Sequence, residues 1–424
     1  MKMRTKGLRH AVLLLVITIA AAAQGQSQWV GTWSTSPLVC EGNNAIAVDD
    51  LKDTTLRQVV HVSIGGTRLQ VRVSNRFGAE PVHFTSVHLA RPASAGAGAI
   101  LVASDKALSF SGKPDIIIPP GADYISDPVE YPLAPLSDLV ISLHADILPP
   151  EQTGHPGSRA TSYLSHGDRV SAADIPNAKK LEHWYFISGV DVASTPGTAA
   201  VVAFGDSITD GHGATLDANN RWTDVLTQRL LASPSTQGLS VLNQGIGGNR
   251  LLLDGIGTNA LARLDYDVLA QAGVQYLIVL EGINDIGMVV HKGEITPTEH
   301  AAFVQRIIAA YGQIILRAHM HGIRVIGATI LPFAGAEFYH PGPASEADRQ
   351  AVNRWILAAG QFDAVIDFDG LMHDPEHPER LLPAFDSGDH LHPSPAGYAA
   401  MGGAVPLSLF DARAVRSQKT YPQR

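Results

Sequence analysis

The sequence predicts an α/β protein in two parts. A β-rich module, of sandwich or jelly-roll-like type, is expected over residues 28–195, and a parallel α/β fold over residues 196–415. Up to about residue 194 apolar residues mostly recur at every second position, whereas from residue 199 short apolar runs alternate with segments of helical periodicity. Period two is typical of half-buried strands, and strand–helix alternation is typical of parallel sheets covered on both faces. The 424 residues suffice for two or three domains.

The first strands are predicted at residues 60–64 and 69–73, where branched apolar residues alternate with polar ones. Gly65 and Gly66 lie between them, a composition typical of a tight turn, so we expect the two strands to pair as a hairpin. Further strands are expected at residues 86–90, 116–118, 139–144 and 184–190, and prolines interrupt the intervals between them. Residues 194–198 are expected to link the two parts.

The second part is predicted to begin with a strand at residues 199–204. Four more apolar runs, at residues 239–242, 275–280, 324–330 and 364–366, are expected to be strands. Helices are expected between and after them, at residues 221–231, 260–270, 298–321, 346–360 and 396–409. Such a sheet collects its chemistry at the carboxyl ends of the strands, which tells us where to look for functional residues.

The N-terminus has the order of a secretory signal. Basic residues precede an uncharged apolar run at residues 11–23, which ends in three alanines. A membrane anchor is the alternative, but the run is shorter than the roughly 20 residues that span a bilayer. We therefore expect residues 1–23 to be cleaved and the mature chain to be secreted or periplasmic, without a membrane segment.

Composition argues against several other classes of protein. The formal net charge of −9 disfavours nucleic-acid binding, which depends on neutralising phosphates. Cys40 is the single cysteine, so the chain can form neither an intrachain disulfide nor a cysteine-rich zinc site. No metal-ligand pattern is found among the 18 histidines. We expect neither a metal nor a cofactor, and the sequence does not indicate an oligomeric state.

Polar residues follow the predicted strands of the second part. The first strand runs into Asp206-Ser207, the second into a glycine-rich loop that contains Gly248, and the third into a turn that contains Asn284. Asp389 and His392 precede a predicted helix near the end of the chain. Taken singly these features are weak, because serine also caps helices and glycine-rich loops also simply turn the chain.

Together these residues have the parts that acyl transfer needs. Ser207 can be the nucleophile, His392 the base that takes its proton, and Asp389 the group that orients the base. The amides of Ser207 and Gly248 and the side chain of Asn284 can donate to an oxyanion. The lone cysteine lies outside these segments, so the predicted nucleophile is oxygen rather than sulfur.

The same segments resemble the SGNH (GDSL-type) hydrolases. Gly205-Asp206-Ser207, the loop holding Gly248, Gly282-x-Asn284-Asp285 and Asp389-x-x-His392 occur in the family's order over about 200 residues. The resemblance implies a flavodoxin-like three-layer α/β/α fold and metal-free ester hydrolysis through an acyl-serine. Residues 29–36, 243–252 and 386–392 are also similar to a secreted subgroup related to xylan-degradation esterases.

Some assignments near these segments stay open. His390, paired with Asp386, is an alternative base, although the family pattern favours His392. Asp206 and Asp285 are expected to bond loop amides. Asn249 and Arg250 have either a substrate contact or a plain surface role.

We therefore expect a secreted serine esterase that removes acyl groups, most simply acetyl, from plant-type polysaccharides or oligosaccharides. One alternative is a lipase, arylesterase or thioesterase of broader acyl specificity. Another is a non-catalytic carbohydrate-binding protein on the same scaffold. The β-rich module either shapes the substrate cleft or supports the catalytic domain.

Overall fold

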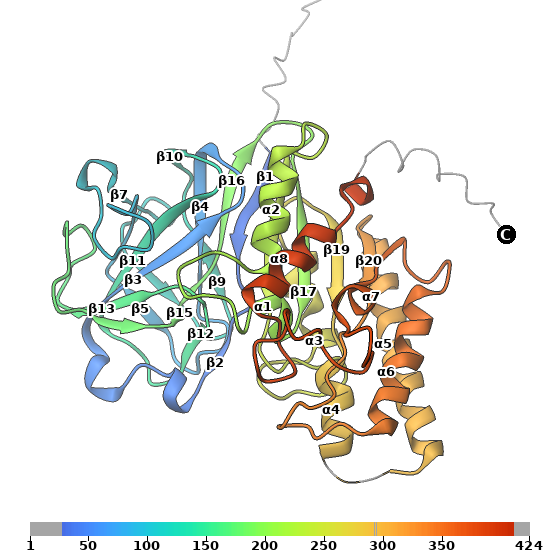
Figure 1. Cartoon of the computed structure of the whole chain (residues 1–424). Helices are drawn as coiled ribbons and strands as arrows, with labels where there is room; N and C mark the ends of the chain where they lie inside the picture. The colour runs from blue at the N-terminus through green and yellow to red at the C-terminus, as the bar shows by residue number, and fades with distance from the viewer. Residues whose placement is uncertain (1–27, 292, 294, 411–424) are drawn as a thin grey trace, which may run out of the picture.

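The computed structural model describes residues 28–291, 293 and 295–410 (Figure 1). The expected signal segment, residues 1–23, lies outside these described residues. Within them, no helix is both long enough and apolar enough to cross a membrane.

The N-terminal part is strand-rich, as expected. Its largest sheet is antiparallel and has, in spatial order, β14 (Lys179–Leu181), β13 (Ser162–His166), β3 (Lys52–Val62), β11 (Ser137–Ile147), β6 (Ser86–Ala90) and β7 (Lys106–Ala107). A second antiparallel sheet has β1 (Gln28–Ser34), β16 (Ile187–Ser194), β4 (Gly66–Ser74) and β10 (Val129–Leu133), with β9 (Asp123–Ile125) also paired to β4. Two smaller groups are β15 (His183–Tyr185), β12 (Gln152–Pro156) and β2 (Leu38–Cys40), and the pair β5 (Val82–Phe84) and β8 (Ile116–Ile118).

The predicted hairpin between β3 and β4 is wrong. Both strands exist, but β3 pairs with β11 and β13, whereas β4 pairs with β16, β10 and β9, so they lie in different sheets. The turn at Gly65 and Gly66 carries the chain from one sheet to the other. A Cβ at Gly65 would lie 2.4 Å from the carbonyl oxygen of Leu133, so the turn is packed too closely for a side chain. The long antiparallel ladder from β3 to β11 replaces the local pairing.

The C-terminal part is built on a parallel sheet. Its spatial order is β18 (Leu239–Gly245), β17 (Ala199–Gly205), β19 (Val274–Leu280), β20 (Arg324–Ala328) and β21 (Ala364–Ile366). This is the 2-1-3-4-5 order of flavodoxin-like folds. Every residue of β17, which lies between β18 and β19, is buried. The five strands predicted for this part are therefore confirmed, and four residues connect β16 to β17.

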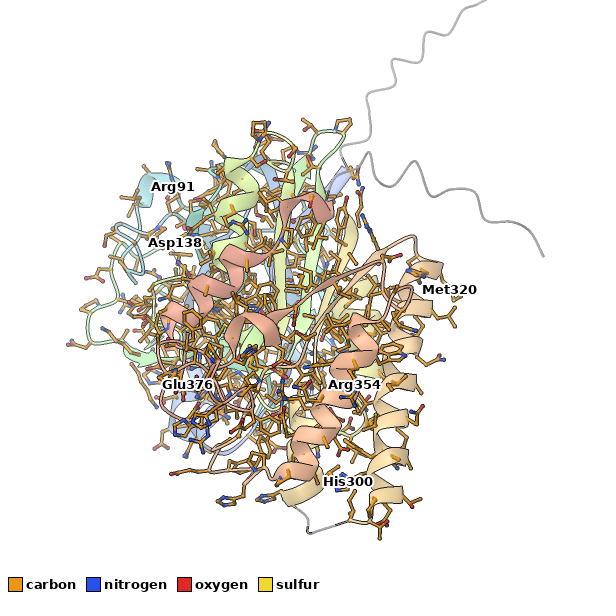
Figure 2. All side chains as sticks on the ribbon, turned by 45° about the vertical axis from the view of Figure 1, so that its right-hand side comes forward. Arg91, Asp138, His300, Met320, Arg354 and Glu376 are labelled. Carbon is orange, nitrogen blue, oxygen red and sulfur yellow. The ribbon has the colours of Figure 1, made fainter. Side chains whose placement is uncertain are left out.

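Helices follow the strands. They are α1 (Ser207–Asp210), α2 (Trp222–Ala232), α3 (Ala260–Leu264), α4 (Ile283–His291), α5 (Pro297–Met320), α6 (Pro343–Leu357), α7 (Phe368–Met372) and α8 (Pro395–Ala404). Right-handed crossovers place the helix after β17 and those after β18 on opposite faces of the sheet. Accordingly α2 contacts α8, whereas α3 contacts α5 and α5 contacts α6. Figure 2 shows Met320 and His300 at opposite ends of α5, and Arg91 and Asp138 on the side of the strand-rich part.

The longest helix, α5, forms where its sequence directs it. Thr296 and Glu299 form a reciprocal capping box at its start, and Pro297 occupies the first position. Its buried face includes Phe303 and Ile307, at the spacing that predicted it.

Two helix predictions need correction. The segment 396–409 is interrupted, because Pro406 lacks the amide that would continue α8, and a separate 3-10 turn follows at Leu407–Phe410. The segment 260–270 is α-helical only to Leu264 and continues as a π-helical turn, Asp265–Leu269.

The two parts contact each other along one edge of the parallel sheet. Strand β1 lies beside β18, and Leu242 of β18 is fully buried. The Ser63 hydroxyl donates to the carbonyl of Val241 at 2.8 Å, and the Gly31 amide donates to that of Ala272 at 3.0 Å. The strand-rich part thus covers an edge that would otherwise expose unpaired backbone groups.

Cys40 ends β2 in the strand-rich part and is a buried free thiol. Burial raises its pKa to about 12. A Cβ on Gly154 of the neighbouring strand would lie 2.5 Å from the sulfur, so the thiol is tightly enclosed on that side.

Candidate active site

Ser207 is placed by the turn that follows β17, the first strand of the parallel sheet along the chain. β17 ends at Gly205, and Asp206 caps α1 with its carboxylate accepting from the Ile208 amide at 2.9 Å. Ser207 is the first residue of that helix, so its amide has no intrahelical carbonyl to bond. The Ser207 hydroxyl therefore lies at the carboxyl edge of the sheet, in the first turn of a helix that Asp206 caps.

The structure brings together three of the predicted residues from opposite ends of the second part. The Ser207 hydroxyl lies 2.8 Å from His392 Nε2, and His392 Nδ1 lies 2.6 Å from Asp389 Oδ2. A carboxylate can only accept from the ring, so Nδ1 carries a proton and Nε2 is the acceptor for the serine. This tautomer is the one that a general base needs.

Asp389 is held as a carboxylate by its own loop. Its Oδ1 accepts from the amides of Leu391 and His392 and from the Ser387 hydroxyl, at 3.0, 2.9 and 3.0 Å. Burial acts to raise the pKa of Asp389, but these bonds and the His392 ring outweigh it and hold the pKa well below its ordinary range. The Asp389 carboxyl group is therefore ionised at neutral pH, where it can accept the hydrogen bond from His392.

Gly248 and Asn284 line the same cavity as Ser207. Gly248 has φ +71, a conformation that favours glycine, and it lies in a turn of the loop that follows β18. Asn284 lies in the first turn of α4, where its Nδ2 donates to the Asn249 carbonyl at 2.8 Å. A primary amide carries two protons, so one remains for a ligand in the cavity. The predicted oxyanion donors are therefore assembled around the serine.

A buried ionic cluster lies beneath these loops. Arg263 of α3 donates to the carbonyls of Gly205 and Gln244 at 2.8 Å each, at the ends of the first two strands. It also pairs with Asp267 at 2.8 Å and with Glu281, at the end of β19, at 3.2 Å. One side chain thus ties together the three strand ends that carry the candidate site.

The carboxylates around this arginine bind protons unusually well. Burial raises the pKa of Asp206 to about 7, and the charge of Asp285 adds to the shift. Burial likewise raises the pKa of Asp285 to about 6 and that of Glu281 well above its ordinary range. With Asp267, these buried acids outnumber the one arginine among them, which disfavours the fully ionised state.

The open assignments can now be compared with the structure. His390 pairs with Asp386 at 2.6 Å, and it is His392 that contacts Ser207. Asp285 accepts from the amides of Leu251 and Leu252 at 2.7 and 3.0 Å, and so bonds loop amides as expected.

The two residues beside the oxyanion loop have different positions. Asn249 is buried and bonds Arg263 and the Thr258 carbonyl, so it has neither the substrate contact nor the surface role considered for it. Arg250 donates to the carbonyl of Asp254 and lines a neighbouring cavity rather than that of Ser207.

The cavity at Ser207 has a volume of about 480 Å³. Its lining includes polar groups such as His212 and Asp389, and Ile256, Phe338, Tyr339 and Leu391 supply apolar surface. Phe338 is 63% exposed and stacks on His291 with ring centroids 5.1 Å apart. A second, more apolar cavity of about 300 Å³ lies beside Arg250, Leu252 and Met288.

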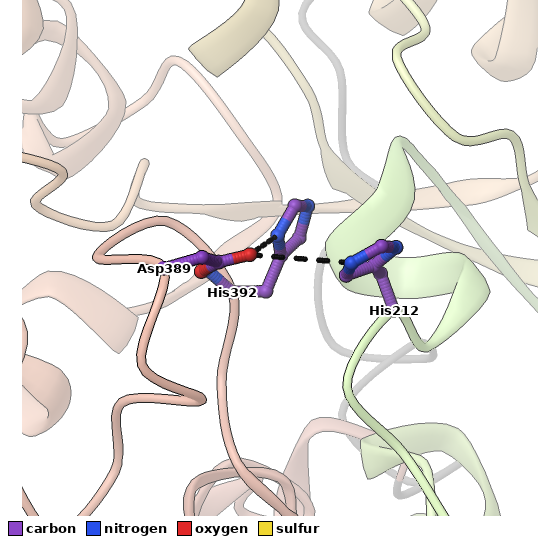
Figure 3. A group of neighbouring side chains, drawn as sticks. All are labelled: His212, Asp389 and His392. Atoms are coloured by element: carbon purple, nitrogen blue, oxygen red, sulfur yellow. Dashed lines mark hydrogen bonds and ion pairs between the residues drawn. The ribbon is translucent and has the colours of Figure 1, made fainter. Parts of the chain in front are cut away.

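His212, Asp389 and His392 have ligand atoms close enough together to suggest a metal site (Figure 3). Two observations disfavour it. His392 Nδ1 donates its proton to Asp389 Oδ2 at 2.6 Å, and a metal would have to displace that proton. Arg159 Nη2 lies 3.2 Å from His212 Nδ1, and because a guanidinium only donates, the proton of His212 is on Nε2, the atom that faces Asp389. With the protons in these positions, His212 and His392 take part in hydrogen bonds and do not present free nitrogen atoms to a shared metal ion.

Sequence reasoning missed several residues at the site. His212 packs against His392, and Tyr339 bonds Asn284. Both lie outside regular helices and strands, so periodicity does not reveal them. Arg263 was overlooked although it lies in a predicted helix, and Glu281, a charged residue directly after an apolar strand, was a usable signal.

Comparison with known proteins gives a family match. Residues 203–400 match the GDSL-like Lipase/Acylhydrolase family. A search of the curated proteins finds no match.

Several solved structures are similar to the chain. A GDSL-like lipase from Bacteroides thetaiotaomicron is 19% identical, with a TM-score of 0.39, over 52% of this chain and 91% of that one. An aryl esterase from M. smegmatis is 18% identical, with a TM-score of 0.37, over 52% of this chain and 99% of that one. A carbohydrate acetylesterase from Sinorhizobium meliloti is 19% identical, with a TM-score of 0.35, over 52% and 99%.

The chain is a carboxylic ester hydrolase. Its C-terminal part, residues 203–400, belongs to the GDSL/SGNH lipase and acylhydrolase family and has the α/β fold of that family.

Proposed function

We propose that the chain is a serine esterase in which Ser207 attacks an acyl ester and the acyl group passes to water. The observation that carries this proposal is the continuous contact from Ser207 through His392 to Asp389, beside Gly248 and Asn284. Neither partner of the serine needs to move before it can give up its proton.

The mechanism follows from these positions. His392 Nε2 takes the proton as Ser207 Oγ bonds the ester carbonyl carbon, and the negative charge of Asp389 stabilises the imidazolium that forms. The amides of Ser207 and Gly248 and the side chain of Asn284 donate to the oxyanion. The imidazolium then protonates the leaving alcohol. Water, deprotonated by the same histidine, releases the acid from the acyl-serine.

For the substrate we propose an acyl ester, most simply acetyl, on a carbohydrate. Asp389 and His390 are among the polar residues that line the cavity, and such groups suit a hydroxyl-rich alcohol. The exposed ring of Phe338 offers a flat apolar surface for the face of a sugar. The negative net charge does not oppose a neutral glycan ester.

One observation favours a second candidate, an esterase for larger acyl or aryl groups. The cavity beside Leu252 and Met288 is mostly apolar and could take such a group. A carbohydrate-binding protein without catalysis is less well supported. Binding alone does not explain the hydrogen bonds that connect Ser207, His392 and Asp389.

We also propose that residues 1–23 are a cleaved export signal, which the order of charges and apolar residues supports. For the strand-rich part we propose a sandwich of jelly-roll type over residues 28–195, supported by its antiparallel sheets, with the hydrolase domain at residues 196–415.

The central experiment measures hydrolysis of p-nitrophenyl acetate by the wild type and by Ser207→Ala. We expect the substitution to lower kcat at least about a thousandfold. Ser235→Ala, on the surface, is the matched control. Unchanged cleavage by Ser207→Ala would overturn the proposed nucleophile.

Two further assays test the substrate class. Faster cleavage of p-nitrophenyl octanoate than of the acetate would favour the larger-acyl alternative. Release of acetate from acetylated xylan, compared with other acetylated glycans, tests the carbohydrate assignment. Finally, N-terminal sequencing of the secreted protein tests the cleavage site.

A further inference from the structure

A loop of the strand-rich part reaches the chain directly after the nucleophile. Arg159 Nε donates to the Gly211 carbonyl at 3.2 Å, and Arg159 Nη2 donates to His212 Nδ1 at 3.2 Å. Thr161 fixes the same loop, because its amide and hydroxyl both donate to Asp217 at 2.6 Å. Arg159 has φ +52, a conformation uncommon for a residue with a side chain, so the loop holds it in a costly geometry.

His212 is itself tied to the nucleophile turn. Its amide donates to the Ser207 carbonyl at 2.9 Å, and its carbonyl accepts from the Tyr398 hydroxyl at 2.6 Å. The backbone of His212 is therefore fixed relative to Ser207, and the ring position is set by Arg159.

The ring of His212 lies against the ring of His392 (Figure 3). Their centroids are 4.0 Å apart and their planes are inclined by 35°. The side chain of His212 is 51% exposed and that of His392 only 10%, so His212 lies on the solvent side and covers the other ring. The hydrogen bonds of His392 hold only the edge of its ring, and the face contact limits its tilt.

Burial and the charged groups that face His212 together lower its pKa, which favours the neutral ring. Burial lowers its pKa, as do the nearby His392 and the cationic Arg159, while Asp389 and Asp210 act in the opposite direction. A neutral ring can pack on the imidazolium of His392 without repulsion, and a protonated one cannot.

We propose that His212, oriented by Arg159 of the strand-rich part, is a positioning residue that holds the His392 ring between Ser207 and Asp389. The inference rests on the proposed serine mechanism and gives the strand-rich part a direct role in it. His212 makes no bond to the substrate in this role, and it acts through His392.

The first test compares His212→Ala with His212→Phe on p-nitrophenyl acetate. Loss of the ring in His212→Ala should lower kcat about tenfold with KM nearly unchanged, because small displacements of a base are costly. His212→Phe keeps an aromatic face and should recover most of that loss. Wild-type kcat in His212→Ala, or equal damage in both variants, would overturn the proposal.

The second test is a pH profile of kcat/KM for Arg159→Met, with and without His212→Phe. Without Arg159 the His212 ring binds a proton more easily, so the loss of activity should be several-fold larger at pH 6 than at pH 8. In the His212→Phe background the same substitution should have an effect that is independent of pH. A loss that is equal at both pH values in both backgrounds would overturn the role of Arg159.

Arg68→Met is the matched control, since Arg68 forms an exposed pair with Glu130 in the same part of the chain. It should leave kcat and its pH profile unchanged. Both tests keep Ser207 intact, so they are separate from the test of the proposed function. If Ser207→Ala abolishes activity while His212→Ala does not reduce it, only the present inference fails.

Discussion

The Tyr339 hydroxyl lies 2.6 Å from Asn284 Oδ1, and this contact fixes which end of the amide faces the cavity. Because Oδ1 accepts from Tyr339 and Nδ2 donates to the Asn249 carbonyl, the amide is oriented from both sides. An inverted amide would present an oxygen to an oxyanion and repel it. The tyrosine thus determines whether Asn284 is a donor at all.

Tyr339→Phe should therefore lower kcat about tenfold, less than complete loss of one oxyanion donor, which costs about 2.7–4 kcal/mol. KM should change little, because the carbonyl oxygen of the bound ester forms a weaker hydrogen bond with Asn284 than the oxyanion does. Steady-state kinetics on p-nitrophenyl acetate measure both constants. Tyr124→Phe, at an exposed tyrosine of the strand-rich part, is the control. A wild-type kcat for Tyr339→Phe would contradict the orienting role.

Asp206→Asn should change how stability depends on pH. The pKa of Asp206 is about 7 in the folded chain, above its ordinary 3.8, so the folded state holds a proton that the unfolded chain has already released. This contribution is complete below about pH 4 and is lost as the pH rises through 7. The asparagine can still accept from the Ile208 amide but never ionises.

The thermal midpoints of wild type and Asp206→Asn at pH 5 and pH 8 measure this effect. The thermal midpoint of the variant minus that of the wild type should be more positive at pH 8 than at pH 5. An equal difference at both values would show that Asp206 does not titrate in this range.

Arg263→Met should destabilise the fold by about 3 kcal/mol, since it leaves buried acids without their cation. The substitution also removes the guanidinium from the face of Phe204, 4.0 Å from the ring centroid. Urea unfolding gives the free energy. Arg306→Met, at an exposed arginine on α5, should change it by less than about 0.5 kcal/mol. A similar small change for Arg263→Met would mean that the cluster contributes little.

Residues 196–415 expressed alone should be insoluble or inactive. Without the strand-rich part, the β18 edge and the side chain of Leu242 are exposed, and the pair of His155 with Asp210, 2.8 Å apart, is lost from the nucleophile helix. Gel filtration and esterase assays, with residues 28–415 as the reference, measure the outcome. A soluble fragment with the kcat of the reference would disprove the dependence.

The position of the candidate site could be predicted from sequence for a simple reason. Ser207, Gly248 and Asn284 each follow an apolar strand, and parallel strands bring their carboxyl ends to one edge wherever helices and loops intervene. The position of the site at this edge can therefore be predicted without knowing the spatial order of the strands.

Strand partners were harder to predict. Period two predicts β3 and β4, but it carries no information about which strands pair. The glycines between them are typical of a hairpin turn, yet here they connect two different sheets. The contacts of Tyr339, His212 and Arg159 depend on where irregular segments meet in space, so they became visible only in the structure. The helix α4 is not among the predicted helices, because polar residues such as Asn284 and Asp285 directly after a strand are also typical of a loop.

The enclosed thiol of Cys40 can report when β2 separates from the neighbouring strand β12. With a pKa of about 12, little thiolate forms at neutral pH, and the closely packed Gly154 blocks access from the neighbouring strand. Thiol reagents therefore react only when this part of the sheet separates. Since β12, which carries Gly154, also carries His155 and its bond to Asp210, the labelling rate measures how often the support of the nucleophile helix comes apart.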